Sequence, residues 1–495
     1  MIFFLCVLSG LLLFLSFPPV DLGGLAWFAF IPLLIVLEKK TFGERFLFGF
    51  LTGFFFFLSS LFWLRHVTWI GLFLLSVYLA LYVALFSVFS GFCFRRFPGL
   101  PQTFLIPAGW VALELLRSHL LTGFGWNLLG YSQWRWTSLL QIADTTGAAG
   151  ISFLVMMGNV AFFLFWKAFR EKKGKLLWPL GLAAALVFAA CLYGSLTLSR
   201  TRPSRVVRIG IVQGNIPQSL KWDASVRELI LSKYERLTQR ICLNHPDIVF
   251  WPETSVPGIL PEEKDLLTRL KRLAKGGKTF LLVGSACRLK EGLANSALLI
   301  TPRGITQRYD KLHLVPYGEY IPFEKEFPFL RNWIVTGDFL PGKSPVVFDP
   351  PSGRFSVLIC FEDIFPELAR RFVKEGAVYL VNITNDAWFR KSAGPTQHAQ
   401  ASLFRAVENR VPIIRAANTG VSCVIDANGR FLGAIADEKG EQIEVTGAKS
   451  FTFSLLTDPP RTFYTRHGDL FAKTCALFAL LGWIAGMTRA EAVKA

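Results

Sequence analysis

The sequence predicts a polytopic α-helical membrane protein with an α/β domain inserted before its last helix. Hydrophobic residues make up 52% of the 495 residues, and the mean hydropathy of +0.42 is too high for a soluble protein. The first 200 residues are nearly all apolar, the middle of the chain has ordinary polarity, and the end is apolar again. We therefore expect a transmembrane bundle of about seven helices over residues 1–200, a mixed globular domain over 205–467, and a C-terminal transmembrane helix over 470–488.

Eight apolar segments are candidates for membrane-spanning helices, which need about 20 residues, with a range of roughly 17 to 25. The first two are short and are separated by Pro18-Pro19, and the fifth contains Glu114 and Arg117, which lie three residues apart and can pair on one helix face. The first segment lacks the basic flank and the small-residue cleavage site of a signal peptide, so we interpret it as an uncleaved helix. The eight segments are 2–17, 22–37, 46–64, 67–94, 104–121, 148–166, 176–196 and 470–488.

The basic residues of the loops orient this bundle. The loops after helices one, three and five contain only Arg65 and Arg135, with Arg117 near a helix end. Short basic loops stay in the cytoplasm. We therefore expect cytoplasmic termini and an extracytoplasmic α/β domain, which in a bacterium with two membranes means a multi-pass inner-membrane protein with a periplasmic domain. The loops after helices two, four and six carry Lys39, Lys40, Arg45, Arg95, Arg96, Lys167, Arg170, Lys172, Lys173 and Lys175.

The net charge of +18 does not indicate nucleic-acid binding, because the domain is expected outside the cytoplasm. We assign the excess to cytoplasmic loops and to contacts with anionic lipid headgroups. The eight cysteines show no CxxC spacing and are spread singly, so we expect no disulfide framework. No histidine has a metal-ligand partner at the usual spacing, and we expect neither a metal nor a cofactor.

Two aromatic segments have alternative interpretations. The loop 122–147 contains Trp126, Tyr131 and Trp136 among its aromatic residues. We interpret these rings as an interfacial belt at the headgroup level, and a lipid-facing wall beside an active site is the alternative. Residues 323–334 are rich in Phe, Leu and Trp, and form either an exposed apolar arm or part of the core.

The α/β domain is predicted from strands that alternate with helices and from hairpins, a pattern typical of a layered sandwich. The predicted strands are 206–212, 247–251, 279–285, 297–301, 304–309, 355–360, 378–383, 413–416, 421–425 and 430–435. The predicted helices are 224–244, 262–275, 365–375 and 395–409.

Three side chains at the edges of apolar segments indicate chemistry. Cys360 ends an apolar strand and precedes two carboxylates, so its sulfur could face a cleft or be inert packing. Glu253 follows the strand 247–251, and Lys311 lies in an aromatic and apolar setting. A thiol, a base and a cation are the groups that acyl transfer through a thioester requires. The alternatives are a structural ion pair between Glu253 and Lys311 and core packing of Cys360.

The order Glu253, Lys311, Cys360 resembles the Glu-Lys-Cys triad of the nitrilase (carbon–nitrogen hydrolase) superfamily. Further motifs resemble the apolipoprotein N-acyltransferase family, as does the plan of several helices, one nitrilase-like domain and a last helix. The resemblance covers essentially the whole chain. Its motifs are Val212-Gln-Gly-Asn-Ile-Pro-Gln-Ser-Leu-Lys-Trp222, Trp251-Pro-Glu-Thr254, Lys311-Leu-His-Leu-Val-Pro-Tyr-Gly-Glu319 and Asn385-Asp-Ala-Trp-Phe389.

The resemblance implies a nitrilase-like αββα sandwich that transfers an acyl chain from a phospholipid to the N-terminal amine of a diacylglyceryl-cysteine lipoprotein. It gives Cys360 the role of nucleophile, Glu253 that of proton acceptor and Lys311 that of oxyanion stabiliser. Two substrates that use one thioester in turn imply ping-pong kinetics. The implied partners are a phospholipid acyl donor, a diacylated apolipoprotein acceptor and membrane lipid, with no nucleic acid, and we expect a monomer.

The resemblance also implies supporting residues and shows two departures. Glu319, Glu362 and Trp222 match supporting positions of the family. Family members often have tyrosine after the nucleophile, where this chain has Phe361, so any role of that hydroxyl is lost. Arg390 stands where the family pattern has glycine, which alters a turn.

Two other functions stay open at this point. A membrane-anchored nitrilase-type amidohydrolase would use the same three residues, with water resolving the thioester. A non-catalytic lipoprotein-binding membrane protein would not depend on Cys360.

Overall fold

The structure is a computed structural model that describes residues 1–172, 177–200, 204–221, 223–332, 338–456 and 458–492. It divides into two compact units, which are taken in turn. The first contains Met1–Arg200, Ser392–Gln400 and Thr462–Ala495, and the second contains Thr201–Lys391 and Ala401–Arg461.

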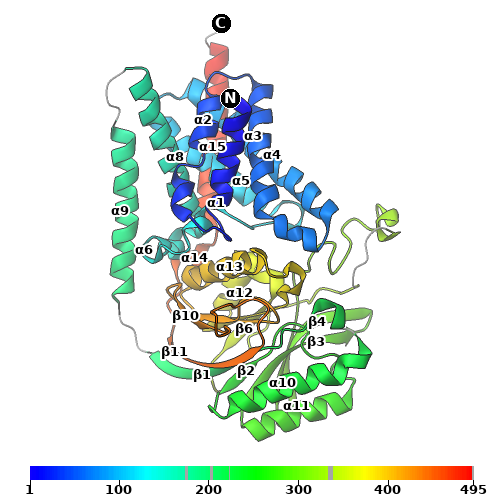
Figure 1. The fold of residues 1–495 in the computed structure, drawn as a ribbon. Helices are drawn as coiled ribbons and strands as arrows, with labels where there is room; N and C mark the ends of the chain where they lie inside the picture. Colours follow the sequence, from blue (N-terminus) through cyan, green and yellow to red (C-terminus); the bar gives the residue numbers. More distant parts are fainter. Residues whose placement is uncertain (173–176, 201–203, 222, 333–337, 457, 493–495) are drawn as a thin grey trace. The chain divides into compact units, whose positions relative to one another are not determined.

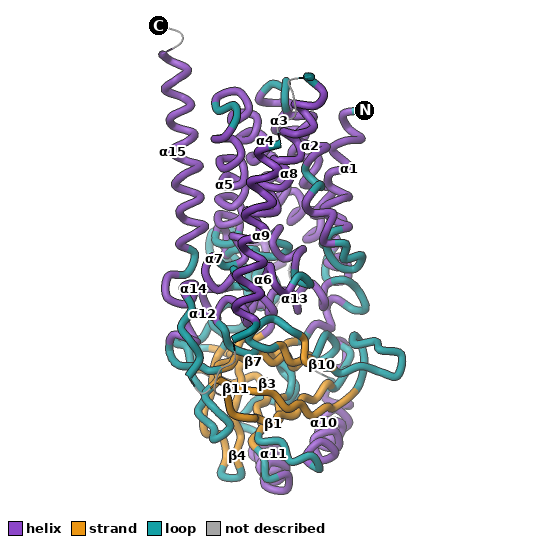
Figure 2. Tube along the Cα trace, turned by 90° about the vertical axis from the view of Figure 1, so that its left-hand side faces the viewer, coloured by secondary structure: helices purple, strands orange, loops and turns teal. Residues whose placement is uncertain are grey.

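The first unit is a bundle of long apolar helices, in which α3, α4, α5 and α8 pack side by side (Figure 2). Thr41 begins α3 with a capping box to Glu44, and the Thr68 hydroxyl caps α4. The bounds are α1 Ile2–Leu15, α2 Ile31–Leu37, α3 Phe42–Ser60, α4 Trp69–Arg96, α5 Leu100–Arg117, α6 Thr137–Leu140, α7 Ala143–Thr146, α8 Ala148–Arg170, α9 Trp178–Leu198, α14 Phe463–His467 and α15 Leu470–Ala492.

Within the described residues, five helices are long and apolar enough to cross a membrane: α3, α4, α8, α9 and the part of α15 over Leu470–Thr488. The predicted helix 22–37 is wrong as a single element, because it is divided into the 3-10 helix η1 (Gly23–Trp27) and the short α2. Gly23 and Gly24 at its start weaken helix formation. Glu114 and Arg117 attract each other as predicted, and each also has a hydrogen bond to the backbone, from Leu129 N–H to Glu114 and from Arg117 to the Trp126 carbonyl.

The interfacial-belt interpretation of loop 122–147 is wrong for Trp126 and Tyr131, which are buried. The indole N–H groups of Trp63 and Trp126 donate to Gln397 Oε1 at 3.0 and 2.8 Å. Gln397 Nε2 in turn donates to the carbonyls of Pro18 and Ser60. A buried amide thus satisfies the polar tips of the rings, so they need no contact with headgroups. Gln397 lies in the first turns of α13 (Gly394–Asn409), which belong to the first unit.

The second unit contains two sheets. In the first, β1, β2 and β3 are parallel neighbours, and β11, β4 and β5 add antiparallel strands in the order β11-β1-β2-β3-β4-β5. In the second, β6, β7 and β8 are parallel and β9 and β10 antiparallel, in the order β10-β9-β8-β7-β6. The strands are β1 Ser204–Gln213, β2 Ile248–Phe250, β3 Phe280–Leu289, β4 Gly292–Thr301, β5 Gly304–Asp310, β6 Phe355–Ile359, β7 Tyr379–Thr384, β8 Ile413–Ala417, β9 Cys423–Ile425, β10 Phe431–Ala434 and β11 Gly447–Leu456.

The two sheets pack face to face between helices, which confirms the predicted αββα sandwich. Helices α10 (Arg227–Cys242) and α11 (Lys264–Gly277) cover the first sheet (Figure 1), and α12 (Pro366–Lys374) packs on the second. The rings of Phe250 on β2 and Phe355 on β6 meet edge to face, with centroids 5.7 Å apart. This apolar layer between the sheets fixes the strand ends that carry the candidate site.

Candidate active site

Cys360 lies at the carboxyl end of β6, where the strand gives way to the 3-10 turn η8 (Cys360–Ile364). Every residue of β6 is buried, and β6 runs parallel to β7. Reactive groups collect at this edge of parallel sheets because the strands end there together. Cys360 has a φ of +53°, in the left-handed region that residues with a side chain seldom adopt. The thiol therefore sits on a strained turn, a feature that is common at functional sites.

Glu362 ties the ends of two strands together. Its buried carboxyl accepts hydrogen bonds from the Tyr309 hydroxyl at 2.8 Å and from the backbone N–H groups of Leu312, His313 and Ile359 at 2.7, 3.0 and 2.7 Å. Burial raises the pKa of Glu362 to about 7, and the hydrogen bonds oppose that rise. Since these donors come from β5, from the segment after it and from the end of β6, Glu362 fixes how these segments approach each other.

Lys311 comes directly after β5 and is held between two carboxylates. Its Nζ lies 2.8 Å from Glu319 Oε2 and 3.7 Å from Glu253 Oε1, and its side chain is 1% exposed. Asn295 Nδ2 donates to Glu253 Oε1 at 2.7 Å and to Glu319 Oε1 at 2.9 Å. Burial opposes the charge of Lys311, but the two carboxylates outweigh burial, so the pKa of this lysine lies above its ordinary value. The site therefore keeps a permanent cation.

The thiol of Cys360 lies within the electrostatic reach of Glu253 and Lys311. Burial of the sulfur raises its pKa above the ordinary value, Glu253 raises it further, and Lys311 lowers it by less. A nearby ammonium favours a thiolate, but Lys311 does not outweigh burial and Glu253 at this sulfur. Part of the Cys360 residue stays exposed. Bond formation at the sulfur must be coupled to the loss of its proton.

Lys221 is a second cation at this site, which the sequence reasoning missed. Its Nζ donates to the backbone carbonyl of Glu253 at 2.9 Å, and the residue is buried. Burial lowers the pKa of Lys221 to about 8, against the attraction of Glu253 and Cys360. Lys221 directly precedes Trp222 in the quoted motif, which marked its position but not its contact with Glu253. Trp222 itself lies outside the described residues.

A buried ion cluster supports the turn that follows Cys360. Arg415 Nη1 donates to Asp363 Oδ2 and to Ser402 Oγ, each at 2.6 Å, and Arg415 Nη2 lies 3.6 Å from Asp386 Oδ2. These contacts join η8 to β8 and to the turn η9 (Asp386–Phe389). A buried charge cluster of this kind fixes its elements because removing one member leaves an unpaired charge.

The two departures from the family pattern have clear positions. The ring of Phe361, the residue after Cys360, packs edge to face on Phe365, with centroids 5.2 Å apart. Arg390 has a φ of +51°, in the region that favours glycine, so the arginine is accommodated with backbone strain.

Three rings of the segment 323–334 are about half exposed, which favours the arm interpretation over core for Phe323, Phe327 and Phe329. Residues 333–337 lie outside the described part.

The described residues contain no group of three His, Cys, Asp or Glu side chains able to hold a metal ion. The structure describes all eight cysteines, and each carries a thiol.

Comparisons with known proteins agree with these features. Residues 9–161 match the model of the apolipoprotein N-acyltransferase N-terminal domain, and residues 208–447 match that of the carbon–nitrogen hydrolases. The apolipoprotein N-acyltransferase of Geobacter metallireducens is 38% identical over 96% of this chain and 93% of its own length. That of Chlorobaculum tepidum is 32% identical over 96% and 94%. This chain belongs to the apolipoprotein N-acyltransferase family.

The family membership confirms the resemblance drawn from the motifs, and it makes the chain an acyltransferase and a membrane protein. Among solved structures, an amidase from Nesterenkonia sp. AN1 is 19% identical, with a TM-score of 0.38 over 54% of this chain and 96% of the amidase. Nit3 of Saccharomyces cerevisiae is 18% identical with the same TM-score.

Proposed function

We propose that this protein transfers an acyl chain from a phospholipid, through a thioester on Cys360, to the N-terminal amine of a diacylglyceryl-cysteine lipoprotein. The observation that carries the proposal is the buried Lys311 ammonium held between Glu253 and Glu319 beside the strained turn of Cys360. A cation, a carboxylate and a thiol, which follow β5, β2 and β6, supply the groups that both halves of the reaction need.

In the first half, Glu253 takes the proton of the Cys360 thiol as the sulfur attacks the ester carbonyl of the phospholipid. The C–S bond forms, and the carbonyl electrons move onto oxygen. Lys311 and the backbone N–H of Phe361 stabilise this oxyanion, and one such donor contributes about 2.7–4 kcal/mol in comparable sites. The ester C–O bond then breaks, and the leaving alkoxide takes the proton from Glu253 and departs as lysophospholipid.

In the second half, the neutral α-amine of the lipoprotein attacks the thioester carbonyl. Glu253 accepts the proton that the amine loses, the same donors stabilise the oxyanion, and the C–S bond breaks as the amide forms. The sulfur regains its proton from Glu253, so the enzyme returns to its starting state. This sequence of two substrates at one sulfur is a ping-pong mechanism.

The supporting residues act through Glu253, Lys311 and Cys360. Glu319 keeps Lys311 charged and in place through the contact at 2.8 Å. Glu362 holds the segment of Lys311 against the end of β6. Phe361 offers an apolar wall for the acyl chain, and Trp222 is proposed as a substrate contact from the family motif alone.

The cellular placement is part of the proposal. The basic loops support an inner-membrane protein with cytoplasmic termini and a periplasmic catalytic domain over 205–467, between a bundle over 1–200 and a last helix over 470–488. The protein works as a monomer on phospholipid and diacylated apolipoprotein, without a cofactor or a nucleic-acid partner.

Mass spectrometry of the Cys360 peptide tests the mechanism. Incubation of the purified protein with phospholipid should give a hydroxylamine-labile acyl adduct on Cys360 and an equal amount of lysophospholipid. A diacylated lipopeptide should then remove the adduct and appear as the N-acyl product. Cys360→Ala should give neither, whereas Cys242→Ala, a matched change at a partly exposed cysteine of α10, should behave as wild type.

Two results would redirect the proposal. Free fatty acid with an unmodified lipopeptide would indicate the amidohydrolase-type reaction with water. N-acylation by Cys360→Ala at the wild-type rate would show that the thioester mechanism is wrong.

A further inference from the structure

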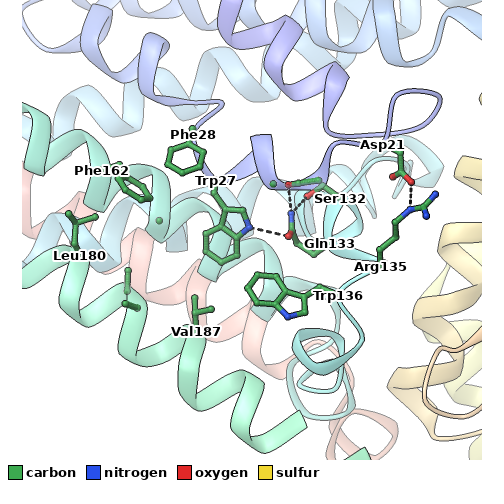
Figure 3. A pocket seen from close by; sticks show the side chains of 15 residues that line it. Asp21, Trp27, Phe28, Ser132, Gln133, Arg135, Trp136, Phe162, Leu180 and Val187 are labelled. Carbon is green, nitrogen blue, oxygen red and sulfur yellow. Dashed lines mark hydrogen bonds and ion pairs between the residues drawn. The ribbon is translucent and has the colours of Figure 1, made fainter. Parts of the chain in front are cut away.

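A cavity of about 680 Å³ lies in the first unit, between α8, α9, η1 and the segment 132–136 (Figure 3). All residues that line it belong to the first unit. Its volume falls within the range of about 300–1,000 Å³ that is usual for small-molecule sites. Its two ends differ in chemistry.

One end of the cavity is apolar. Phe28, Phe162, Leu180 and Val187 form its walls, and they gather on the side of Figure 3 that faces away from the charged groups. Gly158 of α8 and Ala183 and Ala184 of α9 also line the cavity, beside the region where the two helices pack together. Only 17% of the most apolar window of α9 is buried inside the protein. The gap beside α9 therefore requires an apolar occupant, because an empty space would forfeit its dispersion contacts.

The other end is polar, and its inner groups already have partners. Gln133 Nε2 donates to the Gly23 carbonyl at 2.7 Å and to Ser132 Oγ at 2.8 Å, while Gln133 Oε1 accepts from Trp27 Nε1 at 3.0 Å. Water would find few further partners there, and the rest of the cavity is apolar, so a water-filled cavity is disfavoured.

The rim supplies unused donors. Arg135 Nε donates to Asp21, and the guanidinium lies 4.8 Å from the centre of the Trp134 ring. The terminal amino groups of Arg135 have no hydrogen-bond partner among the described residues, and its side chain is 72% exposed. Trp136 is 42% exposed, and its indole N–H is likewise without a partner in the described part of the chain. Both residues line the cavity, and an arginine fork and an indole N–H are each donors that suit phosphate oxygens.

We propose that this cavity holds one glycerophospholipid, with an acyl chain along α8 and α9 and the phosphate at Arg135 and Trp136. The combination of apolar walls with an exposed cationic rim selects an amphipathic anion. A phospholipid carries both parts in one molecule, with the headgroup at the level of the aromatic segment 134–136. The site binds lipid without a step in the acyl transfer, so it does not depend on the proposed mechanism.

Native mass spectrometry of the full chain in detergent tests this proposal. The Cys360→Ala background is used so that no acyl chain is transferred, and the delipidated protein is supplied with dioleoyl phosphatidylglycerol or, separately, with oleic acid. Ala184→Trp fills the cavity, and Ala185→Trp, on the neighbouring exposed position of α9 outside the lining, is its matched control. Arg135→Gln removes the charge, and Arg65→Gln, in another loop, is the control for that change.

We expect Ala184→Trp to retain one phospholipid fewer than its parent and Ala185→Trp to retain the same number. Arg135→Gln should lower phosphatidylglycerol retention about tenfold, as expected for the loss of a charge-assisted hydrogen bond, with Arg65→Gln unchanged. Phosphatidylglycerol should also raise the thermal midpoint of Ala185→Trp but raise that of Ala184→Trp less.

Equal retention by Ala184→Trp and Ala185→Trp would overturn the proposal, since the lipid would then be annular. Equal retention of oleic acid and phosphatidylglycerol by the parent, with no effect of Arg135→Gln, would overturn the assignment of the phosphate to Arg135. The second pair of variants keeps the test decisive if Ala184→Trp fails to fold, because Arg135 is a surface residue.

Discussion

Replacing Lys311 by methionine tests whether the buried ammonium stabilises the oxyanion. Methionine keeps most of the length and volume of the side chain, so the packing around this 1% exposed position is largely retained. The substitution removes the cation that lies 2.8 Å from Glu319 and 3.7 Å from Glu253. The geometry of the carboxylates and the thiol stays otherwise the same.

Two physical effects of Lys311→Met act in the same direction. Losing one oxyanion donor costs about 2.7–4 kcal/mol, which is roughly 10²–10³ in rate. In addition, Glu253 and Glu319 would share Asn295 Nδ2 with no ammonium between them, and their repulsion is relieved by uptake of a proton. A protonated Glu253 cannot accept the proton of the thiol. We therefore expect acyl-enzyme formation to slow roughly a hundredfold or more.

The assay is single-turnover formation of the acyl-enzyme at pH 7, followed by rapid quench and intact-protein mass spectrometry. Lys275→Met, the same change at an exposed position of α11, is the control and should react at the wild-type rate. Lys311→Arg, which keeps the charge in a bulkier group, should fall between the two. A slowing of Lys311→Met by less than about fivefold, or about 1 kcal/mol, would refute the role of the ammonium.

Three further predictions concern pH. Because burial raises the pKa of the Cys360 thiol, alkylation by iodoacetamide should be slow at pH 7 and accelerate steadily up to pH 9, which peptide mass spectrometry measures. Lys221 loses its charge as the pH rises through about 8, so acyl transfer should decline above that pH in wild type and in Lys275→Met. Lys221→Met should start about tenfold slower at pH 7, as expected for a lost charged contact, and lack this decline in a steady-state pH profile. Burial raises the pKa of Glu362 from 4.5 to about 7, so the folded state binds more protons than the unfolded state between these values. Stability should therefore fall by about 3 kcal/mol as the pH rises through this window, and Glu362→Gln should remove that dependence from thermal midpoints.

The sequence could predict those residues of the site that directly follow a strand. Glu253 and Cys360 follow β2 and β6, and Lys311 follows β5. The contributions of Asn295 and Lys221 could not be predicted in this way, because their partner Glu253 comes from a different element. Pairings between elements depend on sheet order, which local periodicity does not contain.

The fold shows the same division between local and long-range information. The αββα layers follow from alternation along the chain, yet the strand β11 was missed although Phe451, Phe453 and Leu455 are buried at every second position. The polar residues between these three positions made the apolar periodicity of β11 difficult to recognise in the sequence. The burial of Trp126 was unpredictable, since its partner Gln397 lies 271 residues further along the chain.

The charges of the site explain why a raised thiol pKa suits this chemistry. At neutral pH two cations, Lys311 and Lys221, face two carboxylates, Glu253 and Glu319, with a neutral thiol on Cys360 beside them. A preformed thiolate would add a third anion to a buried site, which is costly. In the proposed mechanism Glu253 takes the proton during attack, so one negative charge leaves the carboxylate and reappears on the oxyanion, and the total charge is conserved. Lys311 interacts with the Glu253 carboxylate before this step and with the oxyanion after it. The number of anions beside Lys311 therefore does not change.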